Sequence, residues 1–359
     1  MTNRLQSTIK AIKPLDAAAM RAAQLREDNL TKPNGSLGRL EALAIQIAGI
    51  RREAIPRLKD KAIITMAADH GVTRQAVSLY PQAVTRQMVL NFLNGGAAIN
   101  VLARHIGGRV IVVDMGVAGS LPEMAGLVSR SIAPGTRDFS LGAAMSREQA
   151  IAALEAGIEV LEKERGLGLD IVGTGDMGIG NTTAASAVCA AVTGQPVAEV
   201  TGRGTGVDDR QLEHKISVIE KALKLNHPDP ADPLDILAKV GGFEIGGLAG
   251  VMLGGAARQI PVVIDGFISG AAALIACGLA PGVKDYLIPS HLSVEAGHRA
   301  VYHHLRLRPC LDLDMRLGEG TGAALGIFLA EAATRLLGEM ATFAEASVSQ
   351  AEPGKGEGV

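Results

Sequence analysis

One glycine-rich segment has the composition of a phosphate-binding turn. Residues 173–178 carry glycines at the G-x-G-x-x-G spacing, after the apolar run 169–172 and before a run of small residues, 182–191, that predicts a helix. Glycines in such a turn let backbone N–H groups approach a phosphate at a helix N-terminus. The segment therefore predicts either a dinucleotide site, as in a dehydrogenase, or a site for a single phosphate.

Further clusters of glycines and polar residues each follow a short apolar run. They are Asp69-His70-Gly71, Asp114-Met115-Gly116, the glycine loop 202–206, Asp265-Gly266 with Ser269, and Ser290-His291 with Ser293. Ligands of open parallel sheets bind outside the carboxyl ends of the strands. We therefore expect these clusters to lie along one edge of a sheet and to share one site.

The elements that must position these clusters are short strands and longer helices. Apolar runs that suit strands buried on both faces occupy residues 61–66, 109–113, 169–172, 196–200, 261–264 and 286–290. Helical patterns lie between them: Ser146 and Gln149 form a capping box, and another helix follows Asp208. This alternation predicts an α/β fold, a mostly parallel Rossmann-like sheet with helices on both faces.

The two ends of the chain differ from its middle, because residues 15–48 and 321–347 have helical patterns without intervening strands. We expect a small helical domain built from residues 1–54 and 321–350. A large α/β domain with the nucleotide and base site then spans residues 55–320. The glycine-rich residues 351–359 are expected to form a flexible tail.

The amino-acid composition excludes some classes of binding partner. A net charge of −2 with only 3% aromatic residues provides neither the basic surface nor the stacking side chains that nucleic acid requires. The uncharged segment 266–283 is interrupted by glycines and a proline, so it predicts a buried helix and no membrane span. Cys189, Cys277 and Cys310 are widely spaced and read as buried free thiols. With no signal-peptide pattern, we expect a cytoplasmic protein.

The dinucleotide interpretation makes a further prediction that the sequence meets poorly. It requires an acidic residue about 20 positions on, at the end of the next strand, to hold the ribose hydroxyls. Glu199 lies at that distance but inside the predicted strand 196–200, and a second glycine loop containing Arg203 follows it. Two predicted strands also precede the glycine motif, whereas the fingerprint usually opens a sheet. A dehydrogenase remains an alternative.

Motifs along most of the chain resemble those of the nicotinate-nucleotide–dimethylbenzimidazole phosphoribosyltransferase family. They are Lys32-Pro-Asn-Gly-Ser-Leu-Gly-Arg-Leu-Glu41, Ala68-Asp-His-Gly-Val72, Tyr80-Pro81 with Val84-Thr85, Asp176-Met-Gly-Ile-Gly-Asn-Thr-Thr183, Gly241-Gly-Phe243, Asp265-Gly-Phe267, Ile288-Pro-Ser-His291 and Arg316-Leu-Gly-Glu-Gly-Thr-Gly-Ala323. The resemblance implies transfer of phosphoribose from nicotinate mononucleotide to a benzimidazole-type base. It also implies a homodimer and no metal or redox cofactor.

The resemblance also assigns roles to individual residues. Glu319 is the general base that removes a proton from the incoming base. The 5′-phosphate is held by residues of the two glycine loops, namely Gly178, Gly180, Asn181, Thr182, Gly202, Arg203 and Gly204, and Lys215 lies near the nucleotide and faces its carboxylate. Further substrate-binding residues are Asp176, Tyr80, Met88, Leu317, Asp265, Ser290 and His291. His70 and His291 lack a second ligand at a metal-binding spacing, so we expect both to form hydrogen bonds in the site.

Three positions depart from the family pattern. Asp176 stands where well-known members have Glu, and Tyr80 and Met88 stand where some members have small or amide side chains near the aromatic base. The preferred acceptor, whether dimethylbenzimidazole, adenine or a phenolic compound, therefore stays open. A non-catalytic nucleotide-binding protein on the same scaffold is the second alternative, although Glu319 within its glycine frame favours catalysis.

Overall fold

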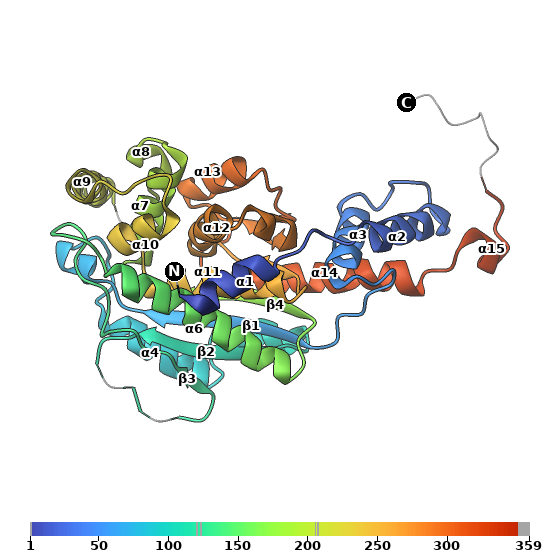
Figure 1. Cartoon of the computed structure of the whole chain (residues 1–359), viewed down its shortest axis with the longest axis horizontal. Helices are drawn as coiled ribbons and strands as arrows, with labels where there is room; N and C mark the ends of the chain where they lie inside the picture. Colours follow the sequence, from blue (N-terminus) through green and yellow to red (C-terminus); the bar gives the residue numbers. More distant parts are fainter. Residues whose placement is uncertain (1, 120, 123, 205, 207, 351–359) are drawn as a thin grey trace. The chain divides into compact units, whose positions relative to one another are not determined.

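The computed structural model describes residues 2–119, 121–122, 124–204, 206 and 208–350 (Figure 1). The expected tail, 351–359, lies outside these residues, as do Thr205 and Val207 of the second glycine loop. The chain divides into two compact units. One comprises Met1–Pro14 with Lys59–Ile327, and the other comprises Leu15–Leu58 with Phe328–Val359.

The larger unit is built on a six-stranded sheet. Its strands are β1 (Lys61–Ala68), β2 (Arg109–Gly116), β3 (Leu127–Ser129), β4 (Ile171–Met177), β5 (Val262–Ile264) and β6 (Leu287–Pro289). Their order is β3-β2-β1-β4-β5-β6, and every neighbouring pair is parallel. The order reverses between β1 and β4, which makes this pair the switch point where open α/β sheets bind ligands. The predicted Rossmann-like α/β fold is confirmed.

Helices cover both faces of this sheet. A β-carbon at Gly255 of α11 (Phe243–Ala257) would meet the side chain of Val262, and one at Gly326 of α14 (Thr321–Glu339) would meet Val263. Adjacent strand residues point to opposite faces, so α11 and the start of α14 lie on opposite sides of β5. α6 (Arg147–Gly166) packs on α11, and its predicted capping box is present, with Ser146 and Gln149 each bonding the other's backbone.

The remaining elements of this unit connect the strands or extend the helical layers. They are α1 (Asn3–Ala11), η1 (Gly71–Gln75), α4 (Ala83–Leu93), α5 (Ala98–His105), α7 (Asn181–Thr193), α8 (Val197–Val200), α9 (Asp209–Asn226), α10 (Pro233–Val240), α12 (Phe267–Leu279), η2 (Pro281–Tyr286), β7 (His291–Leu292), α13 (Ala296–Leu305) and β8 (Leu311–Asp312). The two short strands β7 and β8 pair with each other.

Three strand predictions differ from the structure. Within the predicted strand 196–200, residues 197–200 form the short helix α8, which Pro196 precedes as its N-cap and in which Val200 is the fully buried residue. The edge strand β3 was not predicted, because it has only three residues and none of them is buried, so it lacks the continuous apolar run of a buried strand. Most of the G-x-G-x-x-G segment belongs to β4, which continues to Met177, so the motif is not a turn after a strand.

Residues 1–14 lie with the sheet unit, whereas we expected the N-terminus in the helical domain. The reason is local packing: α1 contacts α6 and α11, Leu5 is fully buried, and the Tyr286 hydroxyl donates to the Lys13 carbonyl.

The smaller unit contains α2 (Ala17–Asn29), α3 (Arg39–Arg51), the rest of α14 and α15 (Phe343–Ala346). Its buried ion cluster joins Lys32 and Glu41 of the resembling motif, residues 32–41, to Glu27 of α2. Lys32 Nζ is 2.8 Å from Glu41 Oε1 and 3.3 Å from Glu27 Oε2, and all three side chains are buried. The motif therefore has a structural role in this unit.

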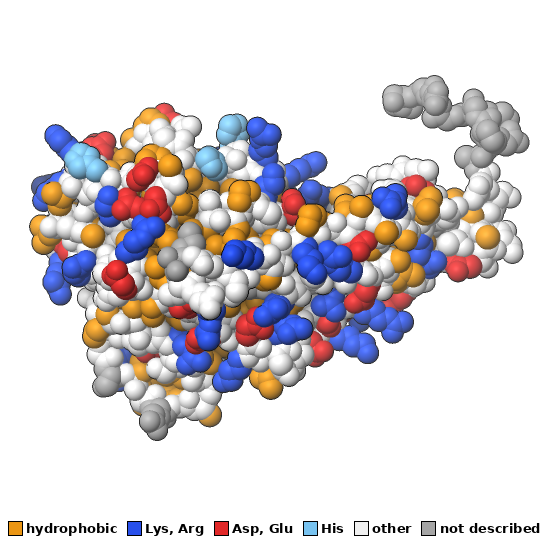
Figure 2. Space-filling view, in the orientation of Figure 1, with side chains coloured by type: hydrophobic (Ala, Val, Ile, Leu, Met, Phe, Trp, Pro, Cys, Tyr) orange, Lys and Arg blue, Asp and Glu red, His pale blue; other side chains and the backbone are white. Residues whose placement is uncertain are grey.

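The surface carries charges of both signs. On the face shown in Figure 2, Lys and Arg side chains are interspersed with Asp and Glu side chains. Within the described part of the chain, no helix combines the length and apolar character needed to cross a bilayer. No disulfide joins the cysteines: Cys189 is buried as expected, whereas Cys277 and Cys310 are only half-buried.

Candidate active site

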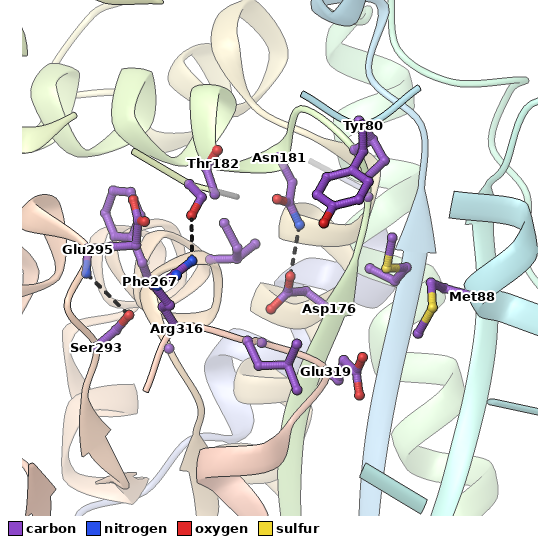
Figure 3. Close-up of a pocket in the computed structure, with 18 of the residues that line it drawn as sticks. Tyr80, Met88, Asp176, Asn181, Thr182, Phe267, Ser293, Glu295, Arg316 and Glu319 are labelled. Carbon is purple, nitrogen blue, oxygen red and sulfur yellow. Dashed lines mark hydrogen bonds between the residues drawn. The ribbon is translucent and has the colours of Figure 1, made fainter. Parts of the chain in front are cut away.

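A pocket of about 470 Å³ opens at the carboxyl edge of the sheet (Figure 3). Its lining combines apolar residues from the segment around α4 and from the segment after β5 with polar residues that follow β4 and β6. The lining residues that the sequence predicted are Tyr80, Met88, Asp176, Gly178, Asn181, Thr182, Gly204, His291, Leu317 and Glu319. Segments more than 200 residues apart in sequence thus meet at one site.

The end of β4 and the start of α7 form the polar wall. Asp176 is buried, its Oδ2 accepts a hydrogen bond of 2.8 Å from Asn181 Nδ2, and its Oδ1 has no partner among the described residues. Gly180 caps α7 with φ +94°, a left-handed conformation that favours glycine. The first N–H groups of α7 follow directly, and Thr182 lines the pocket there. A helix N-terminus of this kind attracts anions.

A smaller hollow of about 30 Å³ adjoins this helix N-terminus. It shares Gly178, Asn181, Thr182 and Gly204 with the main pocket and adds Gly180, Arg203 and Lys215. Lys215 lies in it as a buried cation, donating to Thr182 Oγ1 at 2.9 Å and to the Gly202 carbonyl at 3.2 Å. Burial lowers the pKa of Lys215 to about 8. Arg203 is exposed and pairs with Asp209.

Glu319 sits in a constrained loop before α14. Gly318, Glu319 and Gly320 have φ values of +80°, +64° and +98°, so a glutamate lies in the left-handed region between two glycines. Such a conformation in a non-glycine residue costs free energy and persists only where its surroundings enforce it. Two contacts do so: Thr65 of β1 donates to the Glu319 carbonyl at 3.0 Å, and Gly175 of β4 lies against the same peptide group.

This close contact explains why position 175, the second glycine of the G-x-G-x-x-G segment, has no side chain. A β-carbon at position 175 would lie 2.6 Å from the carbonyl carbon of Glu319 and 2.8 Å from the nitrogen of Gly320. One at Gly173 would lie 3.0 Å from the Ala323 side chain. These two glycines therefore admit the Glu319 loop and α14 onto the strand. The interpretation that they approach a phosphate is wrong, because a protein segment occupies the space beside them.

Asp265 holds the other side of this loop and does not line the pocket, contrary to its predicted substrate-binding role. Its Oδ2 accepts a hydrogen bond from Gly320 N and its Oδ1 one from Ala323 N, each at 3.0 Å. Burial raises the pKa of Asp265 to about 7, against the opposing effect of these bonds. Asp265 thus fixes the Glu319 loop from a fully buried position at the end of β5.

Glu319 lines the pocket and is only 6% exposed. Its Oε2 accepts a hydrogen bond of 3.4 Å from Ile99 N, and burial raises the pKa of Glu319 above its usual value. Burial also raises the pKa of Asp176 well above its usual value, and the nearby charges of Asp265 and Glu244 add to this effect. Figure 3 shows both carboxyl groups on neighbouring segments of the pocket.

The apolar side of the pocket comes from α4 and the loop before it. Tyr80, Val84 and Met88 line this side, and Leu317 lines the pocket next to Glu319. Tyr80 and Leu317 are more than half exposed, at 51% and 58%. Leu317 therefore contributes little to the burial of Glu319.

Other predicted residues lie behind the pocket. His70 is fully buried, and its Nε2 is 2.8 Å from Glu244 Oε1; burial alone lowers the pKa of His70, but the Glu244 carboxylate raises it overall. Ser290 Oγ donates to the Ile264 carbonyl at 2.7 Å. Gly202 lines neither hollow but accepts the hydrogen bond from Lys215. These residues support the site and do not line its cavity.

Burial also lowers the pKa of His291, to about 4, which favours its neutral form. Among the described residues, no group of three or more His, Cys, Asp or Glu side chains is arranged to hold a metal ion.

The pocket also has lining residues to which the sequence analysis gave no individual role. They include Val84, Phe267, Ile268, Ser293, Glu295 and Arg316, of which Ser293 belongs to a cluster expected in the site. Phe267, Ser293 and Arg316 lie within or beside clusters already described. Their proximity to these clusters in the sequence could therefore have identified them. Glu295 lies six residues after β6 and belongs to no motif, so the pattern alone did not identify it.

Comparison with known proteins identifies the family. A family model described as phosphoribosyltransferase matches residues 12–348. A nicotinate-nucleotide–dimethylbenzimidazole phosphoribosyltransferase of Roseiflexus sp. (strain RS-1) is 66% identical over 96% of this chain and 98% of the relative, and one of Geobacter metallireducens is 55% identical over 96% and 98%. The crystal structure of the Thermus thermophilus enzyme of that name is 46% identical, covers 94% of this chain and 100% of its own, and superposes with a TM-score of 0.89. The chain therefore belongs to the nicotinate-nucleotide–dimethylbenzimidazole phosphoribosyltransferase family.

Proposed function

We propose that this enzyme transfers the 5-phosphoribosyl group of nicotinate mononucleotide to 5,6-dimethylbenzimidazole, forming α-ribazole 5′-phosphate and nicotinate. The observation that carries the proposal is the position of Glu319. Its buried carboxyl group faces a pocket that has a helix N-terminus and a buried lysine on one side and apolar side chains on the other. A phosphorylated sugar and a flat aromatic base can therefore lie on the two sides of one carboxylate.

The leaving group needs no acid. In nicotinate mononucleotide the ring nitrogen is cationic, so the pair of electrons in the breaking C1′–N bond neutralises the departing ring. Positive charge then develops on the ribose carbon, where a ring nitrogen of the benzimidazole forms the new bond. The reaction balances without an oxidant or reductant.

The acceptor does need a base. The benzimidazole attacks through one ring nitrogen while the other still bears a proton, and this proton must leave for the product to be neutral. We assign it to Glu319, whose raised pKa makes its carboxylate a stronger base than an exposed glutamate. The strained loop, the bond that Thr65 donates to the Glu319 carbonyl and the bond that Asp265 accepts from Gly320 N hold this residue in place before substrate arrives.

The phosphate site is assigned to the start of α7 and the hollow beside it. Backbone N–H groups near Asn181 and Thr182 and the Lys215 ammonium group provide positive potential there. Asp176 has one oxygen without a partner within the described residues, and Figure 3 shows it between Asn181 and Glu319. Its raised pKa favours a protonated carboxyl group that donates a hydrogen bond to the ligand.

The two alternatives receive less support. A dehydrogenase would use the glycines of residues 173–175 to approach a pyrophosphate, but the Glu319 loop and α14 occupy that space. A binding protein without catalysis has no need for a buried carboxylate in a left-handed conformation. We further propose that the enzyme is a cytoplasmic homodimer, on the basis of the family resemblance.

A direct assay tests the proposed function. The purified enzyme is incubated with nicotinate mononucleotide and dimethylbenzimidazole, and free nicotinate and ribosylated base are measured by chromatography. We expect both products in equal amounts, and no nicotinate without an acceptor beyond slow hydrolysis. Nucleotide binding without nicotinate release would support the non-catalytic alternative, and reduction of added NAD by a hydroxy acid would support the dehydrogenase.

A further inference from the structure

Glu295 is a buried residue of the pocket whose carboxylate accepts no hydrogen bond from the described part of the chain. It is 7% exposed and lies between β7 and α13, at the carboxyl edge of the sheet. Its Oε2 is completely enclosed and has no partner among the described residues. An unsatisfied buried carboxylate is costly, so its retention in a ligand pocket requires an explanation.

Glu295 lies next to the region assigned to the phosphate. A β-carbon at Gly202 would lie 2.8 Å from Cδ of Glu295, and the carbonyl of the same glycine accepts the hydrogen bond from Lys215 Nζ. Glu295 and Lys215 therefore approach Gly202 from two sides, and their charges attract each other. The carboxylate thus lies beside the hollow assigned to the phosphate, on the wall of the main pocket.

The part of a nucleotide that lies next to its 5′-phosphate is the ribose ring. The ring carries two neighbouring hydroxyl groups, each of which needs an acceptor when it is buried. An ionised carboxylate is acceptor-only and has two oxygens, and acidic side chains hold ribose hydroxyls in other nucleotide sites. Lys215 and the N-terminus of α7 balance the negative charge, so a phosphate can bind close to this carboxylate.

We propose that Glu295 binds the ribose 2′- and 3′-hydroxyl groups of the nucleotide and thereby selects ribonucleotides over deoxyribonucleotides. The proposal rests on the proposed function and identifies a part of the same site. Phosphate recognition by Lys215 and α7 is common to both classes of nucleotide. The discrimination between them therefore falls to an acceptor on the sugar side of the pocket, where Glu295 lies.

The test compares nicotinate mononucleotide with its 2′-deoxy and 3′-deoxy analogues, using dimethylbenzimidazole as acceptor. The measured quantity is the ratio of kcat/KM for the ribonucleotide to kcat/KM for each analogue. We expect Glu295→Ala to lower at least one of these ratios by about 10- to 100-fold, since a hydrogen bond to a charged group is lost only with the ribonucleotide. Glu295→Gln, which keeps the side-chain volume, is expected to show an intermediate ratio.

Glu164→Gln serves as the matched control, because Glu164 is a buried carboxylate paired with Arg109 at 3.1 Å and does not line the pocket. Its ratios should equal those of the wild type. Unchanged ratios in both Glu295 variants would overturn the inference, even where overall rates fall. The proposed function fails separately, if the wild type itself releases no nicotinate from the ribonucleotide in the presence of the acceptor.

Discussion

Gly175 of β4 lies directly against the peptide group of Glu319, where a β-carbon would come within 2.6 Å of the Glu319 carbonyl carbon. The glycine of an apparent dinucleotide motif thus makes room for the residue that we assign as the general base. The phosphate region begins only at Gly178 and the start of α7. Strand β4 and the general base Glu319 are therefore coupled through a backbone contact.

Gly175→Ala should impair catalysis more than binding. The added methyl group cannot fit without moving the Glu319 loop, and displacement of a catalytic group by about 1 Å can cost about 100-fold in rate. We expect kcat to fall by about that factor while the affinity for nicotinate mononucleotide, measured by calorimetry, changes little. A large loss of nucleotide affinity with normal kcat would indicate that the glycine does contact the nucleotide.

Asp265→Asn should have a similar effect through a different contact. The amide that replaces the carboxylate accepts through one oxygen only, so the N–H of Gly320 or of Ala323 loses its partner. The Glu319 loop then loses part of what holds its left-handed conformation. We expect kcat to fall by about 10- to 100-fold, with KM for the nucleotide nearly unchanged.

Asp138→Asn is the control for this variant. Asp138 is also a buried loop carboxylate that accepts hydrogen bonds, from Ser140 and Gln75, but it does not line the pocket. Both variants are expected to lower the thermal midpoint, whereas only Asp265→Asn should lower kcat. An equal loss of kcat in the two variants would show that the effect of Asp265 is general destabilisation.

Nucleotide affinity should depend on pH through Lys215. Because burial lowers the pKa of Lys215 to about 8, its ammonium group is charged below pH 8 and becomes neutral above it. Binding of the phosphate should therefore be strong below pH 8 and weaken as pH rises through this value. Calorimetric titrations between pH 6.5 and 9.5 measure this change.

Lys215→Gln should bind nicotinate mononucleotide about 10- to 100-fold more weakly at pH 7 and should lose this pH dependence. Lys221→Gln, an exposed position on the same helix, is the control and should retain the wild-type profile. Persistence of the pH 8 transition in Lys215→Gln would assign it to another group.

Lys32→Met should destabilise the helical unit strongly. It leaves the buried carboxyl groups of Glu27 and Glu41 without their cation, and breaking a buried ion pair in this way costs about 3–5 kcal/mol. Denaturant unfolding followed by circular dichroism measures the loss. The triple variant Lys32→Met, Glu27→Gln, Glu41→Gln should recover part of it, and a triple variant no more stable than the single one would contradict this account.

Much of the fold was predictable because the buried parallel strands are continuous apolar runs. Five of the six predicted runs coincide with strands of the sheet, and the polar clusters after them do lie at its carboxyl edge. Residues 196–200 have a similar composition, but residues 197–200 form a helix that follows Pro196 and packs on α7, α9 and α13 instead of joining the sheet. Composition over five residues cannot distinguish the two.

The site was less predictable, because its supporting contacts connect residues far apart in sequence. The reason for Gly175 is a peptide group 144 positions later, and Asp265 supports a loop more than 50 residues away. His70 follows a strand as a ligand-binding histidine would, but its partner is Glu244, which the sequence motif does not reveal. Glu295 was identified as a candidate binding residue only from the structure, in which its buried Oε2 has no hydrogen-bond partner among the described residues.

The role of Glu319 as general base is the central claim, and a single-turnover comparison of the wild type with Glu319→Gln tests it most directly. The variant retains the size of the side chain and the backbone contacts to Thr65 and Gly175. Enzyme in excess over nicotinate mononucleotide is mixed with dimethylbenzimidazole, and nicotinate release is followed. We expect unchanged nucleotide affinity and at least a roughly 100-fold slower release, within the range for loss of general base catalysis. Release at close to the wild-type rate would contradict the account.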